Sequence, residues 1–175
     1  MLWFLLFLFM IGIDYTTKYI IKSHFLVYQS INIIDNFFKI TYVKNNGIAF
    51  GMFQKMGNYF LFLTPLAIIF LLIFFYKTKN KNFLLKISFT LIIAGAVGNY
   101  IDRILYGYVI DFLDVDFFNI VIRPFQILSF KFQGYELYRW PTFNFADSII
   151  SIGVFLLFVE SFFEKKEKKN ASNII

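Results

Sequence analysis

Four long apolar segments, separated by polar stretches, dominate the pattern of hydrophobic and polar residues along the chain. They cover residues 2–21, 59–76, 83–101 and 143–163. A helix needs about 20 largely apolar residues to cross a bilayer, and about 17–25 suffice when tilt is allowed. The pattern therefore predicts a membrane protein, mainly α, with four transmembrane helices.

The first apolar segment lacks the features of a cleaved signal peptide. No basic residue precedes its apolar run, and Asp14, Thr17 and Lys18 follow in place of a small-residue cleavage site. We therefore expect this segment to be retained as a span.

Lysines between the segments predict the orientation in the membrane. Three lysines lie within residues 77–81, between the second and third segments, and four more follow the fourth segment. Cytoplasmic loops carry an excess of Lys and Arg. We therefore expect both termini to be cytoplasmic and residues 22–58 and 102–142 to be extracytoplasmic. Residues 1–163 would form one domain, followed by a basic and disordered cytoplasmic tail over 164–175.

The two outer segments carry strand patterns. Residues 31–43 are rich in β-branched and aromatic types around an Asp-Asn turn signal, which predicts a small extracytoplasmic β-sheet. In the second extracytoplasmic loop, short strands are predicted near 121–127 and 130–137. Its aromatic residues suit a membrane–water interface.

Composition narrows the chemistry. The chain is 59% hydrophobic, has no Cys and has one His, His24. Soluble domains average about 45–50% apolar residues, so the membrane class is supported. Thiol catalysis, disulfides and a multi-His zinc site are excluded, and no G-x-S-x-G motif accompanies His24. The net charge of +6 includes no aromatic-interleaved basic patch, so nucleic acid is not an expected partner. Carboxylates and lysines remain as candidate catalytic groups.

Four aspartates fall at the predicted outer ends of the spans, namely Asp14, Asp102, Asp111 and Asp147. An ionised side chain at bilayer depth costs about 2.5–3.5 kcal/mol on insertion scales, so such a residue is a functional candidate by default. Asp111 and Asp147 each lie in a dense polar motif that contains an Asn. This pattern indicates a site that activates water.

Two of the polar motifs have a simple structural interpretation. Asp14 and Lys18 are spaced i,i+4, which favours an ion pair on one helix face. Asn45 and Gly47 favour a turn. The alternative for Asn45 is an amide that donates to a bound peptide.

The third span carries a polar face and a run of small residues. Asn99, Asp102 and Arg103 share one helix face, and Gly107 is placed to end the helix. Asp111 would then follow on an extended stretch that folds back towards the helices. The alternative is a solvated cluster at the rim. The small residues over 94–98 predict close helix packing, or room for a substrate helix.

Asn144 and Asp147 lie in the first turn of the fourth span, again at i,i+3. A carboxylate at a helix N-terminus is stabilised by the helix dipole by about 0.3–1 kcal/mol, so Asp147 has a structural interpretation beside the catalytic one.

Together the motifs resemble those of bacterial lipoprotein signal peptidase, also called signal peptidase II, in order, spacing and number of spans. The resemblance extends over residues 2–163. The matching motifs are Asp14-x-x-Thr17-Lys18, Asn45-x-Gly47-x-Ala49-Phe50, Gly98-Asn99-x-x-Asp102-Arg103-x-x-x-Gly107-x-Val109-x-Asp111-Phe112 and Phe143-Asn144-x-Ala146-Asp147.

The resemblance implies an intramembrane aspartic endopeptidase of the bacterial inner membrane, without metal or cofactor. Its substrates would be prolipoproteins with a diacylglyceryl-modified cysteine, cut before that cysteine, and globomycin would inhibit it. Asp111 and Asp147 would be the catalytic pair. The supporting or substrate-binding residues would be Asp14, Lys18, Asn45, Gly47, Asn99, Asp102, Arg103, Asn144 and Ala146. The stretch between Asp111 and Asp147 is longer than is usual in the family.

Four spans with acidic residues also fit another class of membrane protein, namely a small transporter or channel subunit that uses aspartates as a proton relay. Such a relay would distribute acids through the depth of the membrane. The sequence instead gathers them at one rim, which favours the peptidase.

Overall fold

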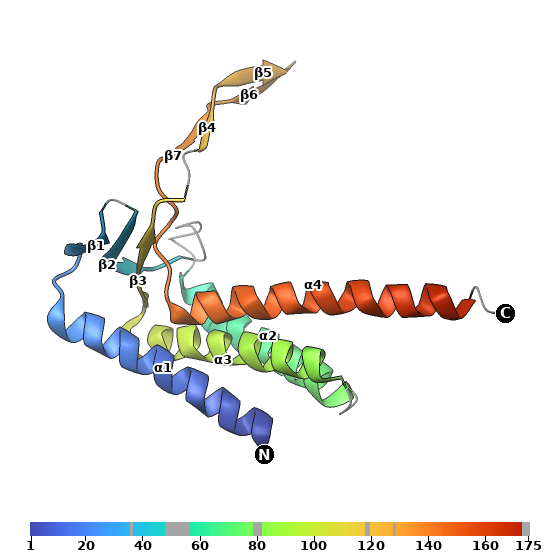
Figure 1. The fold of residues 1–175 in the computed structure, drawn as a ribbon. Coiled ribbons are helices and arrows are strands. Elements are labelled where there is room, and N and C mark those ends of the chain that lie inside the picture. The colour runs from blue at the N-terminus through green and yellow to red at the C-terminus, as the bar shows by residue number, and fades with distance from the viewer. Residues whose placement is uncertain (36, 48–56, 79–81, 118–119, 128, 173–175) are drawn as a thin grey trace.

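The computed structural model describes residues 1–35, 37–47, 57–78, 82–117, 120–127 and 129–172 (Figure 1). Its helices are α1 (Leu2–His24), α2 (Gly57–Lys77), α3 (Phe83–Tyr106) and α4 (Phe145–Ser172). Its strands are β1 (Ser30–Ile34), β2 (Phe38–Asn45), β3 (Val109–Val115), β4 (Ile120–Ile122), β5 (Phe125–Ile127), β6 (Phe130–Phe132) and β7 (Tyr135–Leu137).

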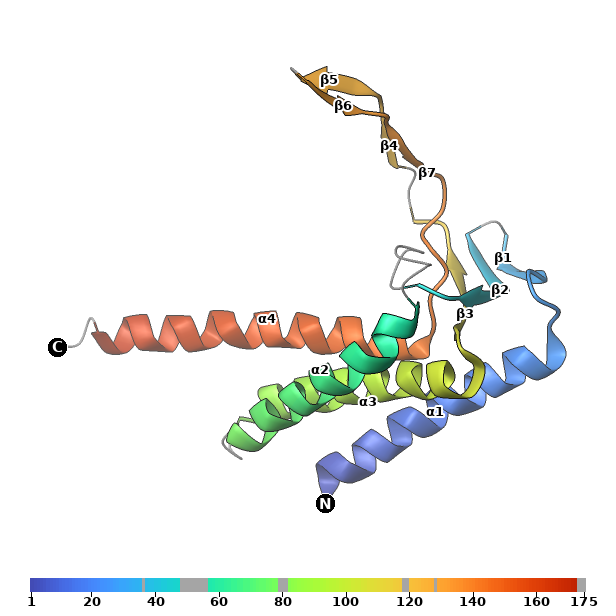
Figure 2. The same ribbon diagram turned by 180° about the vertical axis from the view of Figure 1, so that it is seen from behind.

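The four helices lie alongside one another, and the strands gather at one end of them (Figures 1 and 2). Helix α3 is the central one, because it contacts α1, α2 and α4. It is also the most buried, with polar residues such as Ser88 and Asn99 inside the protein. The site residues of α3 are therefore enclosed by the other elements.

Small residues allow α3 and α4 to approach closely. A Cβ at Gly95 would lie 2.5 Å from the backbone oxygen of Ala146 and 2.6 Å from Cγ1 of Ile150. A Cβ at Gly98 would collide with the carboxylate of Asp14 in α1. The prediction that residues 94–98 serve close helix packing is confirmed.

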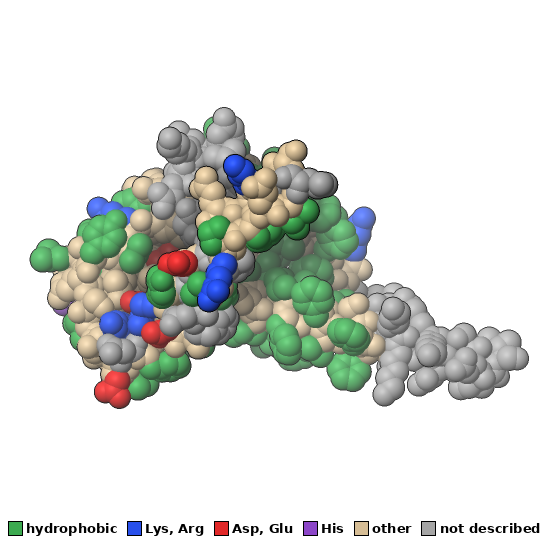
Figure 3. Space-filling view, turned by 90° about the horizontal axis from the view of Figure 1, so that it is seen from above, with side chains coloured by type: hydrophobic (Ala, Val, Ile, Leu, Met, Phe, Trp, Pro, Cys, Tyr) green, Lys and Arg blue, Asp and Glu red, His purple; other side chains and the backbone are tan. Residues whose placement is uncertain are grey.

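Among the described residues, three helices are long and apolar enough to cross a membrane, namely Leu2–His24, Phe83–Tyr106 and Phe145–Phe163. Leu61–Lys77 forms a shorter apolar helix. Many large apolar side chains on these helices are exposed, such as Phe9, Phe70 and Phe155. In the space-filling view, hydrophobic side chains dominate along the helices, whereas most of the visible charged ones lie over the strand end (Figure 3).

The helices extend beyond some of the predicted spans, and the predicted helix end at Gly107 is confirmed. Helix α3 continues beyond residue 101 to Tyr106, where Gly107 ends it in the left-handed conformation with φ 77°. Helix α4 begins at Phe145 instead of residue 143, because Phe143 pairs with Leu113 of β3. It extends to Ser172, so the prediction of a disordered tail is wrong for residues 164–172.

A three-stranded antiparallel sheet of order β1-β2-β3 rests at the end of the helices. The first two strands confirm the sheet predicted over 31–43. The third strand, β3, carries Asp111 opposite Val43 of β2, and Asn45 lies opposite Val109. Strand β3 had been predicted only as an extended stretch. The sheet therefore places Asn45 and Asp111 side by side.

Residues 120–127 and 129–137 form an arm of two short antiparallel ladders, β4 with β7 and β5 with β6. The arm leaves the sheet and projects away from the body of the molecule (Figure 2). The two strands predicted here are each divided in two, at Arg123-Pro124 and Gln133-Gly134. Pro cannot donate to a strand ladder, and Gly134 has a φ of 87°, so each break has a local cause.

Candidate active site

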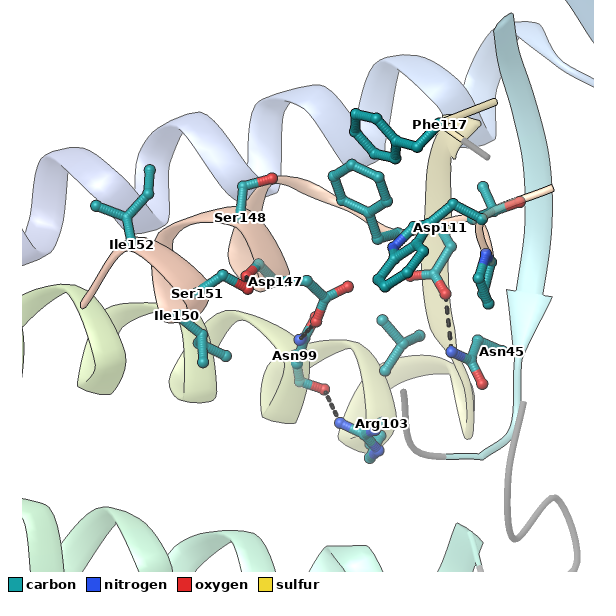
Figure 4. Close-up of a pocket in the computed structure, with 15 residues that line it drawn as sticks. Asn45, Asn99, Arg103, Asp111, Phe117, Asp147, Ser148, Ile150, Ser151 and Ile152 are labelled. Carbon is teal, nitrogen blue, oxygen red and sulfur yellow. Dashed lines mark hydrogen bonds between the residues drawn. The ribbon is translucent and has the colours of Figure 1, made fainter. Parts of the chain in front are cut away.

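Asp111 is buried at the inner edge of the sheet, with an exposed fraction of 1%. Each of its carboxylate oxygens accepts a hydrogen bond from an asparagine amide. Asn45 Nδ2 donates to Oδ2 at 2.8 Å (Figure 4). Asn144 Nδ2 donates to Oδ1 at 2.7 Å. The two amides fix the plane of the carboxylate.

Asp147 lies in the first turn of α4, where it forms a reciprocal cap with Asn144. The backbone N–H of Asp147 donates to Asn144 Oδ1 at 3.0 Å, and the backbone N–H of Asn144 donates to Asp147 Oδ2 at 3.1 Å. This is the arrangement of a capping box, with Asn and Asp in place of Ser and Glu. Asn99 Nδ2 donates to the other oxygen, Oδ1, at 2.8 Å. The structural and catalytic interpretations of Asp147 are thus compatible.

Asn144 links the two carboxylates, since its side chain binds Asp111 and its backbone N–H binds Asp147. Its side chain is fully buried. Burial and, secondly, the negative charge of Asp147 raise the pKa of Asp111 to about 7, although the amides of Asn45 and Asn144 oppose the rise. The two aspartates therefore form an electrostatically coupled pair.

A buried ion cluster lies behind the pair. Lys18 Nζ lies 2.8 Å from Asp14 Oδ2 and 3.0 Å from Asp102 Oδ2, and it donates to Asn99 Oδ1 at 2.9 Å. The predicted ion pair of Asp14 and Lys18 is confirmed, with Asp102 as a second partner. Because Lys18 also holds Asn99, the cluster fixes the amide that binds Asp147.

The two carboxylates of the ion cluster also bind the backbone of neighbouring elements. Asp14 Oδ1 accepts from the N–H of Ala146 at 3.0 Å, and Asp102 Oδ2 accepts from the N–H of Ile110 at 3.1 Å. Ala146 has no exposed surface, so the packing around it leaves room only for a small side chain. The cluster thus connects α1 and α3 with the segments that carry Asp111 and Asp147.

Arg103 joins α3 to the loop after β2. Its guanidinium donates to the backbone oxygens of Asn99 at 3.1 Å and Gly47 at 3.2 Å. Asn45 Oδ1 accepts from the N–H of Gly47 at 2.9 Å, so the predicted turn is confirmed while the amide of Asn45 serves Asp111. Ala49 and Phe50 of the same motif lie outside the described residues.

A cavity of about 550 Å³ opens beside the aspartates. Among the residues that line it are Asn45, Asn99, Arg103, Asp111 and Asp147. The carboxylates and amides of this set converge on it in Figure 4. Of the other polar residues predicted for the site, Lys18 and Asn144 contact residues that line the cavity, whereas Asp14 and Asp102 are connected to it through Lys18.

The apolar wall of the cavity was not predicted from the sequence. It includes Phe117, Trp140, Pro141, Phe143 and Ile150. Only Ile150 could have been found by spacing, because it follows Asp147 at i+3 on the same helix. Phe117 and Trp140 come from the base of the arm, which no local pattern places near Asp111.

A clasp at the base of the arm holds this wall. Arg139 Nε lies 2.8 Å from Asp114 Oδ1, its Nη1 lies 3.2 Å from Asp116 Oδ2, and Thr41 Oγ1 donates to Asp114 Oδ2 at 2.8 Å. The rings of Phe117 and Trp140 meet edge to face at 6.2 Å. The clasp joins the two chain segments that enter and leave the arm.

Comparison with known proteins identifies the family of the chain. Residues 6–163 match the family model described as signal peptidase (SPase) II. The chain belongs to the signal peptidase II family. This signal peptidase is 41% identical over 161 residues to a protein of Syntrophus aciditrophicus named lipoprotein signal peptidase, with 89% of each chain covered. It is 38% identical to a protein of the same name from Fusobacterium nucleatum subsp. nucleatum, with 97% of this chain and 91% of that protein covered.

Two solved structures show the same fold. One is described as a bacterial membrane enzyme determined by the in meso method at 2.3 Å resolution, with a TM-score of 0.80 and 32% identity over 95% of this chain and 90% of that one. The other carries the same description at 1.9 Å resolution, with a TM-score of 0.71 and 34% identity over 90% of each chain. The signal peptidase is therefore a membrane protein.

Proposed function

We propose that this signal peptidase is an intramembrane aspartic endopeptidase. Its substrates are prolipoproteins with a diacylglyceryl-modified cysteine, and it cuts before that cysteine to release the signal peptide. The observation that carries the proposal is the binding of two aspartates from different elements, Asp111 and Asp147, to the single residue Asn144 at a cavity. The names of its relatives support the substrate class.

Two carboxylates that share a site do not both ionise easily, so one keeps a proton. We assign that proton to Asp111, whose pKa is raised to about 7. Asp147, ionised, takes a proton from water as the water oxygen bonds to the scissile carbonyl carbon, while Asp111 gives its proton to the carbonyl oxygen. The product of this step is a neutral tetrahedral diol.

Collapse of the diol breaks the bond between carbon and nitrogen. Asp147 passes its proton to the nitrogen of the leaving cysteine, and one hydroxyl of the diol returns a proton to Asp111. The pair then has the protonation with which it began. The cycle requires no metal or cofactor.

The supporting residues act by position. Asn45 and Asn144 hold Asp111, Asn99 holds Asp147, and the ion cluster of Asp14, Lys18 and Asp102 holds Asn99. Such fixed geometry matters because catalytic groups must stay within about 0.5 Å of the productive arrangement. Arg103 is a substrate-binding candidate, since it lines the cavity beside both aspartates.

In the proposed topology four spans cross the bacterial inner membrane, both termini are cytoplasmic and the site faces the outer leaflet. The lysines at residues 77–81 and after residue 164 support this orientation. The apolar wall of the cavity suits a signal peptide and a lipid-modified cysteine, and globomycin would occupy the same cavity.

Cleavage of a purified, diacylglyceryl-modified prolipoprotein by the protein in lipid nanodiscs tests the proposal. We expect mass spectrometry to show a new N-terminus at the modified cysteine, with no cleavage when globomycin is added. The same prolipoprotein without the lipid is the matched substrate control and is expected to remain intact. Equal cleavage of both substrates, or cleavage elsewhere, would contradict the proposed specificity.

A further inference from the structure

The tip of the arm has one apolar and one polar face. In the β5–β6 ladder Phe125 is opposite Phe132, with ring centroids 5.0 Å apart, and Gln126 is opposite Lys131. Cross-strand partners share a face of a sheet and successive residues alternate between faces. Phe125, Ile127 and Phe132 therefore lie on one side of the tip, and Gln126 and Lys131 on the other.

The apolar side is open. Phe125 is 46% exposed and Ile127 is 62% exposed. A two-stranded hairpin is marginally stable in water, because it needs a third strand or a packed face to bury its apolar residues. The arm consists of such ladders and projects away from the described helices. Its apolar side thus requires a partner outside the described part of the chain.

The direction of the arm identifies that partner. The arm runs across the direction of the helices, and its tip leans back towards the side of the sheet on which the helices lie (Figures 1 and 2). Helices that span a bilayer are surrounded by lipid on that side, and the bilayer surface lies near their ends. The arm therefore extends over the lipid beside the helices.

Composition agrees with a lipid partner. The arm and its base include the exposed side chains of Phe117, Phe125 and Tyr138. Tyr is enriched at membrane–water interfaces, and Phe is typical of the apolar face that interfacial segments bury in lipid. Arg123 and Lys131 are exposed on the same arm. Cationic side chains beside an apolar face place their charged ends among lipid headgroups and favour anionic lipids.

We propose that the arm, residues 120–127 and 129–137, is an interfacial hairpin that lies in the lipid leaflet nearest the sheet, with Phe125, Ile127 and Phe132 inserted among the acyl chains. The polar side, with Gln126 and Lys131, faces the headgroups and water. The proposal rests on the arm and on the membrane-spanning helices, and it does not depend on which residues catalyse.

The consequence for the enzyme follows from the clasp at the base of the arm. The arm leaves the sheet through Phe117 and returns through Trp140, and both side chains line the cavity. An arm held in the leaflet keeps this wall at the level of the lipid, where the acyl chains of a lipid-modified substrate lie.

Site-directed nitroxide labelling tests this placement directly, because the chain has no native cysteine. Ile127→Cys and Gln126→Cys are labelled separately, and the full-length protein is reconstituted in vesicles of phosphatidylethanolamine and phosphatidylglycerol. Collision with oxygen, which concentrates in lipid, and with a water-soluble nickel chelate is measured by electron paramagnetic resonance. Asn46→Cys, at an exposed loop position, provides a reference outside the arm.

We expect the label at residue 127 to collide mainly with oxygen and the label at residue 126 mainly with the nickel chelate. The two positions are neighbours on one strand, so only the face of the hairpin differs between them. Equal and high nickel collision at both positions would overturn the proposal, because the arm would then stand in water. Exclusion of both reagents at residue 127 would also overturn it, because the arm would then contact protein, such as a second copy of the chain.

Discussion

At the scale of single residues, the site depends on Asn144 more than on any other supporting side chain. Its amide donates to Asp111 and to Asn99, while its side-chain oxygen and backbone N–H complete the cap with Asp147. One residue thus sets the positions of both proposed catalytic carboxylates. No other supporting residue binds both of them among the described hydrogen bonds.

Replacement of Asn144 by Ala is expected to lower kcat by about 100-fold, which is the scale of loss for a displacement of roughly 1 Å at a catalytic group. Cleavage of lipid-modified prolipoprotein measures the effect, and circular dichroism measures the remaining helix content. Asn32→Ala is the matched control, because Asn32 is exposed on β1. An Asn144→Ala enzyme with wild-type kcat would show that Asn144 does not orient the pair.

The proton on Asp111 gives a second prediction. With a pKa of about 7, Asp111 is mainly protonated below pH 7 and loses its proton as the pH rises through that value. Because the proposed mechanism needs this proton, kcat is expected to fall above about pH 7. The pH profile of prolipoprotein cleavage measures the fall.

The same pKa can be followed without activity. Asp147→Asn removes the negative charge that is the second cause of the raised value, so the pKa of Asp111 is expected to move down in this variant. Infrared titration of the carboxylic acid band in the two proteins measures the shift. An unchanged titration would show that the carboxylates do not interact.

Residue spacing predicted local pairs of polar residues, whereas the resemblance to signal peptidase II implied the complete set. Asn99 with Asp102 and Asn144 with Asp147 are i,i+3 pairs, and a helix brings such pairs together whatever the rest of the fold. The apolar wall was not predictable in this way. Phe117 and Trp140 meet only because the clasp closes a loop, and no periodicity encodes that closure.

At the scale of elements, the contact between α3 and α4 leaves no room for a side chain at Gly95. A Cβ there would meet the backbone oxygen of Ala146, which cannot rotate away. Overpacking of this kind costs about 1–3 kcal/mol. Gly95→Ala is therefore expected to lower the thermal unfolding midpoint in detergent.

Gly12→Ala is the matched control, because nothing lies within 4 Å of a Cβ at Gly12 in α1. Ala is preferred to Gly in a helix by roughly 0.5–1 kcal/mol, so this variant is expected to be as stable as the wild type or slightly more stable. If Gly95→Ala and Gly12→Ala had the same thermal unfolding midpoint, the close approach of α3 and α4 would be refuted.

Hydropathy predicted the helices because each of them contains a long apolar run, which in three of them is long enough to cross a membrane. It predicted their ends less well. Helix α3 runs on to Tyr106 through Asp102 and Arg103, because those charged groups are satisfied inside the protein by Lys18 and by backbone oxygens. Strand β3 was missed as a strand, because its partner β2 lies far away in sequence and its own pattern does not alternate cleanly.

At the scale of the whole molecule, the proposed orientation places the sheet, the arm and the aspartates on the outer side. Asn46 lies in the loop after β2, next to the site. Lys77 is the last residue of α2, at the end of that helix farther from the site. Both residues are exposed. Under the proposed topology, Asn46→Cys is expected to react with a membrane-impermeant maleimide in spheroplasts whose cytoplasmic membrane is intact. Lys77→Cys should react only after permeabilisation. Labelling of Lys77→Cys before permeabilisation would contradict the proposed topology and indicate the opposite orientation.

The central claim is that Asp111 and Asp147 together catalyse peptide cleavage. Asn has nearly the shape of Asp, so the packing of the site is expected to be retained in the Asp→Asn variants. Asn cannot act as a general base or share the proton of a pair. Because the two groups act as a unit, each single loss is expected to be as severe as the double loss. Asp35→Asn is the matched control, since Asp35 lies exposed in the turn after β1.

The most direct measurement is single-turnover cleavage of diacylglyceryl-modified prolipoprotein by Asp111→Asn, Asp147→Asn, the double variant and Asp35→Asn, each in lipid nanodiscs. We predict no detectable cleavage by the first three, wild-type cleavage by Asp35→Asn, and retained binding of globomycin by both single variants as proof of folding. Substantial cleavage by either single variant that still binds globomycin would contradict the aspartic pair.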